Sequence, residues 1–235
     1  MGHVTFEQFG QVHKAPSLTE PLFADNTWEQ IIKACQTNTV PDTWEVGDQK
    51  AMTIGEEEHM ITIIGKNHDV DYDGNYAPLT LQMQDCLSTK YKMQSTRTNE
   101  GGWDASIPYN GEAWDYVKYS LPREVKNGIR SIRKYTSAGK QSSSIVESED
   151  NDIFLLSEVE VFGTMSNSFA GEGTQYAYYA AGNSKVKKVD GTATAWWLRS
   201  PDKGTSTRYC RVSSSGTAGD YNADTENGIS YAFCF

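Results

Sequence analysis

The C-terminal part of the chain begins with Trp196-Trp197-Leu198-Arg199-Ser200-Pro201, continues through a polar segment at 203–228 and ends in Ile229-Ser230-Tyr231-Ala232-Phe233-Cys234-Phe235. The final stretch alternates bulky and small residues, which indicates a strand whose aromatic face must be covered. Of the 26 residues in the segment at 203–228, twelve are Gly, Ser or Thr, so this segment has little to bury. We therefore expect two anchored strands that present a polar, Tyr-bearing insert on a rigid base.

Hydrophobic periodicity predicts short strands and a few helices in the rest of the chain. Thr27 and Gln30 have the spacing of a capping box, which predicts a helix over 27–36. Helices are also expected over 111–119 and 121–135. Loops are expected over 136–150 and 166–191. The predicted strands lie at 50–54, 59–64, 78–84, 151–162, 195–198, 209–213 and 229–235.

These elements predict an α+β fold with short mixed or antiparallel strands and two or three flanking helices. Residues 25–235 are expected to form a single domain, and residues 1–24 an N-terminal arm or linker, because Pro16 and Pro21 break any helix there. The predicted core includes Trp28, Ile31, Leu121, Ile129, Phe154, Leu156, Trp196 and Phe233.

The charge balance excludes several classes of partner. Lys and Arg number 21 against 31 Asp and Glu, a formal net charge of −10. Nucleic acids and anionic membrane surfaces attract basic patches, so neither is expected as a partner. The apolar runs are too short to span a bilayer, and the first residues lack the pattern of a signal peptide.

Metal and thiol chemistry have little support in the sequence. Asp69, Asp71 and Asp73 precede Gly74 as in a calcium loop, but Thr80 occupies the twelfth position, where a bidentate Glu is needed. We expect a solvated acidic turn and no cofactor, with calcium as the alternative. Four cysteines without a CxxC pair are expected to be free thiols; a Cys210–Cys234 disulfide is the alternative if their strands are neighbours.

Catalytic motifs are also scarce. Glu158 and Glu160 would point to the same face of the strand predicted over 151–162, which allows a carbohydrate-active enzyme with two carboxylates. The same pair would equally suit hydrogen bonds to a neighbouring loop. No GxSxG motif and no phosphate-binding glycine loop is present, so we expect a protein that is not an enzyme.

Five stretches carry a resemblance to a known family. They are NTWEQIIKACQTNTVPDTWEVGDQKAMTI (26–54), IIGKNHD (63–69), IFLLSEVEVFG (153–163), AWWLRSP (195–201) and NGISYAFCF (227–235). This pattern resembles virion-associated domains that are common in phages and prophages of gut Gram-positive bacteria. Here Ser230-Tyr231 replace the Arg-Pro that is usual near the family's C-terminus.

The family is similar in layout to the C-type-lectin-like fold of phage receptor-binding tips and retroelement-diversified variable proteins. The resemblance implies a C-type-lectin-like domain with a C-terminal surface open to diversification. Formylglycine-generating enzymes share that superfamily, but the chain has no counterpart of their catalytic cysteine pair.

The expected function is therefore non-enzymatic binding. As a virion protein of tail or fibre, made in the host cytoplasm, the chain would recognise a bacterial surface protein or glycan. The arm would contact other virion proteins, and the domain could form a homo-oligomer. The alternatives are the enzyme with Glu158 and Glu160, a purely structural virion decoration, and a solvated loop without a partner. The ligand-binding side chains are expected to project from one exposed face: Arg199, Lys203, Ser206, Arg208, Tyr209, Tyr221, Asn222 and Asp224.

Overall fold

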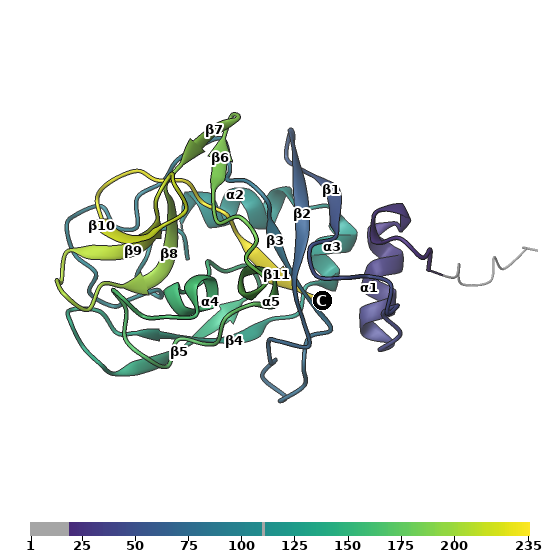
Figure 1. The fold of residues 1–235 in the computed structure, drawn as a ribbon, viewed down its shortest axis with the longest axis horizontal. Coiled ribbons are helices and arrows are strands. Elements are labelled where there is room, and N and C mark those ends of the chain that lie inside the picture. Colours follow the sequence, from purple (N-terminus) through teal and green to yellow (C-terminus); the bar gives the residue numbers. More distant parts are fainter. Residues whose placement is uncertain (1–18, 110) are drawn as a thin grey trace, which may run out of the picture.

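Residues 19–109 and 111–235 are described by a computed structural model of the chain, and Figure 1 shows their fold. The described residues contain one 3₁₀ turn, five short α-helices and eleven strands. The helical elements are η1 (Phe23–Asp25), α1 (Trp28–Gln36), α2 (Glu112–Ser120), α3 (Arg123–Gly128), α4 (Glu158–Phe162) and α5 (Ala177–Ala180). Helix α1 confirms the prediction over 27–36, since Thr27 and Gln30 form both hydrogen bonds of the capping box.

The strands pair antiparallel in four separate sheets. A four-stranded sheet has the order β1-β2-β3-β11, and a three-stranded sheet has the order β10-β9-β8. Strands β4 and β5 form one hairpin, and β6 and β7 another. The bounds are β1 Gln49–Ile54, β2 Glu57–Lys66, β3 Leu79–Met83, β4 Ile132–Ser137, β5 Ile145–Asn151, β6 Lys187–Val189, β7 Thr192–Thr194, β8 Trp196–Pro201, β9 Arg208–Val212, β10 Ala218–Asn222 and β11 Ala232–Cys234.

One continuous core joins these elements into a mixed α/β domain. In Figure 1 the two larger sheets lie toward opposite ends of the long axis, and β11 is the edge strand of the four-stranded sheet, next to β3. Phe233 and its neighbours in β11 are buried, as the aromatic alternation predicted. Seven of the eight predicted core residues are buried, and Ile129 is half-buried against the same core.

The prediction of one helix over 121–135 is wrong for the residues after Gly128. Helix α3 ends at Gly128, and the chain continues as β4 from Ile132. Position 128 accommodates only glycine without a shift of its neighbours. A Cβ at Gly128 would lie 2.7 Å from the side chain of Ile32 in α1. The apolar spacing of the segment fitted a helix, but β4 is stabilised by pairing with β5, which lies in the segment expected to be a loop.

Two other loop predictions are corrected. The segment at 166–191 contains α5 and β6. The polar insert at 203–228 contains β9, close to the strand predicted over 209–213, and also β10, which was not predicted. Gly216, at φ +84°, lies in the turn of the β9–β10 hairpin, a conformation that glycine adopts without strain. The insert is therefore an ordered hairpin with its own backbone pairing rather than a long solvated loop.

The folded domain starts before residue 25. Phe23 is buried, and its ring packs edge-on against Trp28 and Trp44 at centroid distances of 6.2 and 5.5 Å. The Trp44 indole donates to Glu20 O over 3.2 Å, which ties this segment to the domain. The last residues of the predicted arm at 1–24 are therefore part of the folded domain. The rest of the predicted arm, residues 1–18, lies outside the described residues.

Candidate functional site

Strand β8, the WWLRSP stretch, is buried along its whole length. Its register with β9 shifts between Trp197 and Pro201, so the middle of the strand leaves the regular ladder. There the Arg199 N–H donates to Leu156 O over 2.9 Å instead of pairing with β9. The Arg199 side chain at this point of the strand is fully buried in the interior of the domain.

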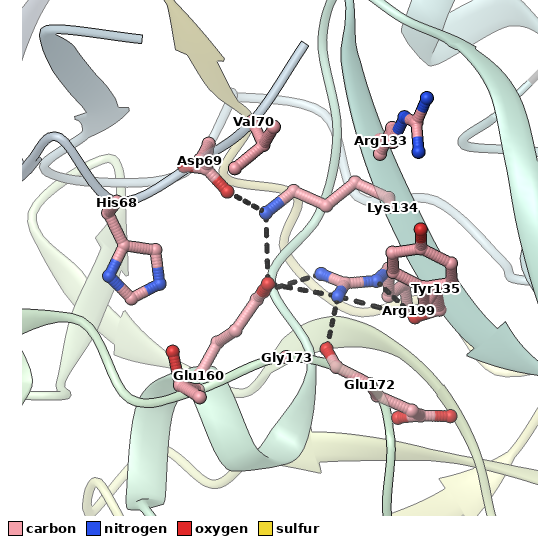
Figure 2. A pocket seen from close by; sticks show the side chains of 11 residues that line it. His68, Asp69, Val70, Arg133, Lys134, Tyr135, Glu160, Glu172, Gly173 and Arg199 are labelled. Atoms are coloured by element: carbon pink, nitrogen blue, oxygen red, sulfur yellow. Dashed lines mark hydrogen bonds and ion pairs between the residues drawn. The ribbon is translucent and has the colours of Figure 1, made fainter. Parts of the chain in front are cut away.

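Arg199 lies at the centre of a buried ionic cluster, which Figure 2 shows at the wall of a cavity of about 330 Å³. Its guanidinium pairs with both carboxylate oxygens of Glu160, one of them at 3.0 Å. It also donates to Leu155 O at 2.9 Å and to Glu172 O at 2.6 Å. A planar guanidinium suits this bidentate arrangement, which an ammonium cannot reproduce.

A second cation, Lys134 of β4, extends the cluster to distant parts of the chain. Its ammonium donates to Asp69 Oδ1 at 2.6 Å, to Glu160 Oε1 at 2.9 Å and to the Tyr176 hydroxyl at 2.8 Å. Asp69 Oδ2 also accepts from the hydroxyls of Thr80 and Tyr176. These bonds use all three ammonium donors, so the cluster holds segments of the fold together rather than offering a free cation.

The charges of the cluster shift the pKa values of its carboxyl groups. Burial alone would raise the pKa of Asp69, but Lys134 and the hydrogen bonds from Lys134 and Thr80 outweigh it and hold that pKa at about 2. Burial opposes ionisation of Glu160 as well, and the charges of Arg199 and Lys134 still keep its pKa below the usual value. Both carboxylates therefore stay ionised at neutral pH.

Glu172 differs from these two carboxyl groups. Burial raises its pKa to about 7, although the Ser137 N–H, the Ser200 hydroxyl and Arg199 favour the ionised form. Arg199 bonds its backbone carbonyl rather than its carboxylate, which explains why the cation compensates burial only in part. Glu172 is thus the member of the cluster that titrates near neutrality.

Glu172→Gln should flatten the pH dependence of stability. Because the folded-state pKa is raised from 4.5 to about 7, the folded protein binds a proton there more tightly than the unfolded chain. The contribution of Glu172 to the free energy of unfolding is fully present below about pH 4.5 and is lost as pH rises to about 7. Urea unfolding between pH 4.5 and 7.5 should show this decline in the wild type and not in Glu172→Gln. The exposed Glu226→Gln is the control; an unchanged slope in Glu172→Gln would contradict the assignment.

Glu158 and Glu160 do not form a pair on a strand, because residues 158–162 form helix α4. Ser157 and Glu160 make both hydrogen bonds of a capping box, and Gly163 ends the helix in the left-handed conformation at φ +70°. Glu160 is bound to the cations of the ionic cluster, and Glu158 accepts from Asn167 and Ser168, including both backbone N–H groups. The Ser-x-x-Glu spacing at 157–160 is the signal that could have identified the helix.

The three aspartates of the predicted acidic turn do not converge on one point. Asp69 is buried in the ionic cluster. Asp71 accepts the Asn75 N–H at 2.8 Å and pairs with Arg130 at 3.3 Å. Among the described residues, no group of three or more His, Cys, Asp or Glu is arranged to hold a metal ion. Asp73 N–H also bonds Asp71 Oδ1, so this carboxylate organises the turn itself.

The four cysteines are free and buried, as predicted. Cys210 lies in β9 and Cys234 in β11, which belong to different sheets. Burial raises the pKa of the Cys35 and Cys86 thiols to about 12, and those of Cys210 and Cys234 well above the usual value. None of these thiols is therefore a ready nucleophile at neutral pH.

The structure does not place the eight predicted ligand-binding residues on one face. Arg199 and Tyr209 are buried, so both are removed from the predicted surface. Tyr209 and Tyr221 are directly paired across β9 and β10, and so are Arg208 and Asn222. Since successive residues of a strand point to opposite faces, Tyr221 lies on the face opposite Arg208 and Asn222. The prediction placed both tyrosines on the same face as the polar residues because it did not take into account that side chains alternate between the two faces of a strand.

Two of the remaining six predicted residues line a cleft beside this hairpin. Lys203 and Arg208, both predicted, line it, whereas Ser206, Asn222 and Asp224 are partly exposed nearby in the same segment. Arg208 pairs with Asp220 at 2.9 Å, and the Lys203 ammonium bonds Met165 O at 2.7 Å. Asp224 pairs with Arg97 at 3.1 Å. This polar cleft has a volume of about 450 Å³ and is lined by Ser166, Asn167, Asp202, Lys203, Gly204, Thr205, Thr207, Arg208 and Asp220.

Asn99, which the sequence did not single out, holds the wall of the polar cleft in place. Its buried side-chain amide donates to Asp202 O at 3.3 Å, Thr205 O at 2.9 Å and Arg208 O at 2.8 Å. Its backbone N–H donates to Ser206 O at 2.8 Å. One residue, about 100 positions earlier in the chain, thereby fixes the turn at 202–208.

Together, the fold and these contacts define a mixed α/β domain with antiparallel strands, built around a buried ionic cluster and bearing a pre-formed polar cleft. Residues 80–235 match the family described as Domain of unknown function (DUF6273), and the chain belongs to this family. The match covers about two thirds of the chain and includes β8, the polar cleft and β11. No curated protein and no solved structure matches the chain. No described helix has the length and apolar character needed to cross a membrane.

Proposed function

We propose that this domain is a non-enzymatic recognition domain that binds a component of a bacterial surface through the polar cleft. The observation that carries the proposal is the pinning of the turn at 202–208 by Asn99. A wall that is fixed before binding loses little conformational entropy when a ligand arrives. Polar side chains displayed on such a rigid base are typical of recognition surfaces.

The virion setting of this proposal rests on the resemblance of the sequence motifs to phage and prophage domains. In that setting the C-type-lectin-like layout places the variable, ligand-contacting segment near the C-terminus, where the polar cleft also lies. The same resemblance supports localisation in the phage particle and attachment through the N-terminal residues to other virion proteins. A homo-oligomer remains part of this proposal.

The double substitution Lys203→Ala and Arg208→Ala should weaken binding to bacterial cells by about tenfold or more, which corresponds to about 1.4 kcal/mol. Both side chains line the polar cleft, and Arg208 is 47% exposed, so the melting temperature should change little. Binding of the labelled full chain to a panel of bacterial strains measures the effect. Tyr221→Ala, on the opposite face of the hairpin, is the matched control and should leave binding unchanged. If the double variant binds cells as well as the unsubstituted chain does, the polar cleft is not the binding site. If the unsubstituted chain binds no cells at all, the alternative of a purely structural decoration is favoured.

A further inference from the structure

The chemical make-up of the polar cleft is unusual for a protein-binding surface. Its nine lining residues are all Ser, Asn, Asp, Lys, Gly, Thr or Arg, with no aliphatic or aromatic side chain among them. Protein partners obtain most of their binding energy from aromatic and other large anchors that fill desolvated pockets. The lining of the polar cleft has no apolar side chain that could pack against such an anchor.

The charges of the polar cleft balance. Lys203 and Arg208 contribute two positive charges, and Asp202 and Asp220 two negative ones, so the formal sum of the lining is zero. Arg208 and Asp220 are already paired at 2.9 Å. A strongly charged ligand would therefore meet as much repulsion as attraction. A neutral ligand that both donates and accepts hydrogen bonds finds donors and acceptors in the same lining.

Hydroxyl and carboxylate groups that are held in place by hydrogen bonds line the turn at 202–208, where they lie close together as donors and acceptors. The Thr205 and Thr207 hydroxyls lie 3.0 Å apart and bond each other. Asp202 Oδ1 accepts the Gly204 N–H at 3.1 Å, which orients this carboxylate within the turn. A volume of about 450 Å³ lies in the range of small-ligand sites.

From these observations we infer that the polar cleft binds a neutral, hydroxyl-rich saccharide unit by direct hydrogen bonds from its side chains. This inference rests on the proposed function, since it names the ligand class of the same cleft. No metal ion is needed in this scheme, because Asp202 and Asp220 are the two carboxylates of the lining and Asp220 is already paired. A protein partner is the competing outcome of the test.

Thr207→Val separates the two outcomes, because it replaces a hydroxyl by a methyl group of nearly the same size. Loss of the hydroxyl should weaken saccharide binding at least fivefold, whereas an apolar protein contact would gain from the methyl group. Thr217→Val is the matched control: its hydroxyl also bonds a neighbour, Ser213, at 2.7 Å, but it lies in the hairpin turn outside the polar cleft. Thermal unfolding of both variants checks that each one folds.

The full chain is applied to an array of neutral and acidic bacterial oligosaccharides, and to cells treated with periodate or with protease. The inference is supported if the chain binds neutral glycans, if Thr207→Val weakens this binding and if periodate abolishes it. The binding should also survive protease and a metal chelator. Protease-sensitive, periodate-resistant binding that still needs Lys203 and Arg208 overturns the saccharide and leaves the proposed function standing. If a metal chelator abolishes the binding, the inference that side chains alone contact the saccharide is overturned. Absence of binding to every glycan and every strain overturns both proposals.

Discussion

Arg199→Ala should destabilise the domain by about 3–5 kcal/mol in urea unfolding, the cost of removing one partner from a buried ion pair. The substitution leaves the Glu160 carboxylate in the interior with Lys134 as its remaining cation. It also removes the donors that serve Leu155 O and Glu172 O. The same cluster joins β4, α4 and β8, so its loss affects several elements together.

Arg199→Lys provides a measurable intermediate if the alanine variant does not fold. A lysine keeps the charge but loses the bidentate geometry, so we expect a smaller yet clear loss of stability. Arg208→Ala removes an arginine from an exposed pair and should cost less than about 1 kcal/mol. If Arg199→Ala and Arg208→Ala cost the same, the buried cluster is not what stabilises the fold.

Gly139→Ala should be destabilising by more than about 3 kcal/mol, because it combines backbone strain with a collision. Gly139 has φ +77°, where alanine costs about 1–2 kcal/mol. A Cβ at this position would in addition lie 1.7 Å from Asn99 O, a backbone atom that cannot turn away as a side chain does. Denaturant unfolding measures the loss.

Gly191→Ala isolates the two contributions to that loss. Gly191 has the same φ of +77°, but a Cβ there meets nothing within 4 Å. We therefore expect only the strain cost of about 1–2 kcal/mol from Gly191→Ala. Because Asn99 holds the wall of the polar cleft, Gly139→Ala should also weaken ligand binding, and Gly191→Ala should not. Equal stability losses in the two variants would show that the close approach to Asn99 has no energetic weight.

Elements whose signals lie within a few residues could be predicted from the sequence. The Thr27–Gln30 capping box correctly placed α1, and the aromatic alternation at the C-terminus correctly predicted a buried strand. The free cysteines and most of the core were also correct. These predictions hold because hydrogen bonds of a cap and the alternation of a strand are local properties.

The prediction failed where a local pattern fitted two structures. Val159 and Val161 alternate as in a strand, yet the capping box of Ser157 and Glu160 forms a helix. Leu121 and Val125 continue to Ile129 at helical spacing, yet pairing with β5 takes residues 132–137 into a strand. In the first case a local cap signal outweighs the alternation of the valines. In the second case the segment's partner in the fold decided the outcome, and the periodicity of a single segment does not contain that information.

The site shows the same division. Lys203 and Arg208 could be identified as displayed side chains, because the segment around them has little to bury. Local patterning was thus enough to predict the apolar strands at either end of the C-terminal segment and the polar character of the insert. Long-range packing, in contrast, buries Arg199, turns Tyr221 away from the polar cleft and brings Asn99 to its wall. The reason is distance along the chain: Arg199 meets Glu160 across 39 residues and Lys134 meets Asp69 across 65, and such contacts exist only after the segments have packed together.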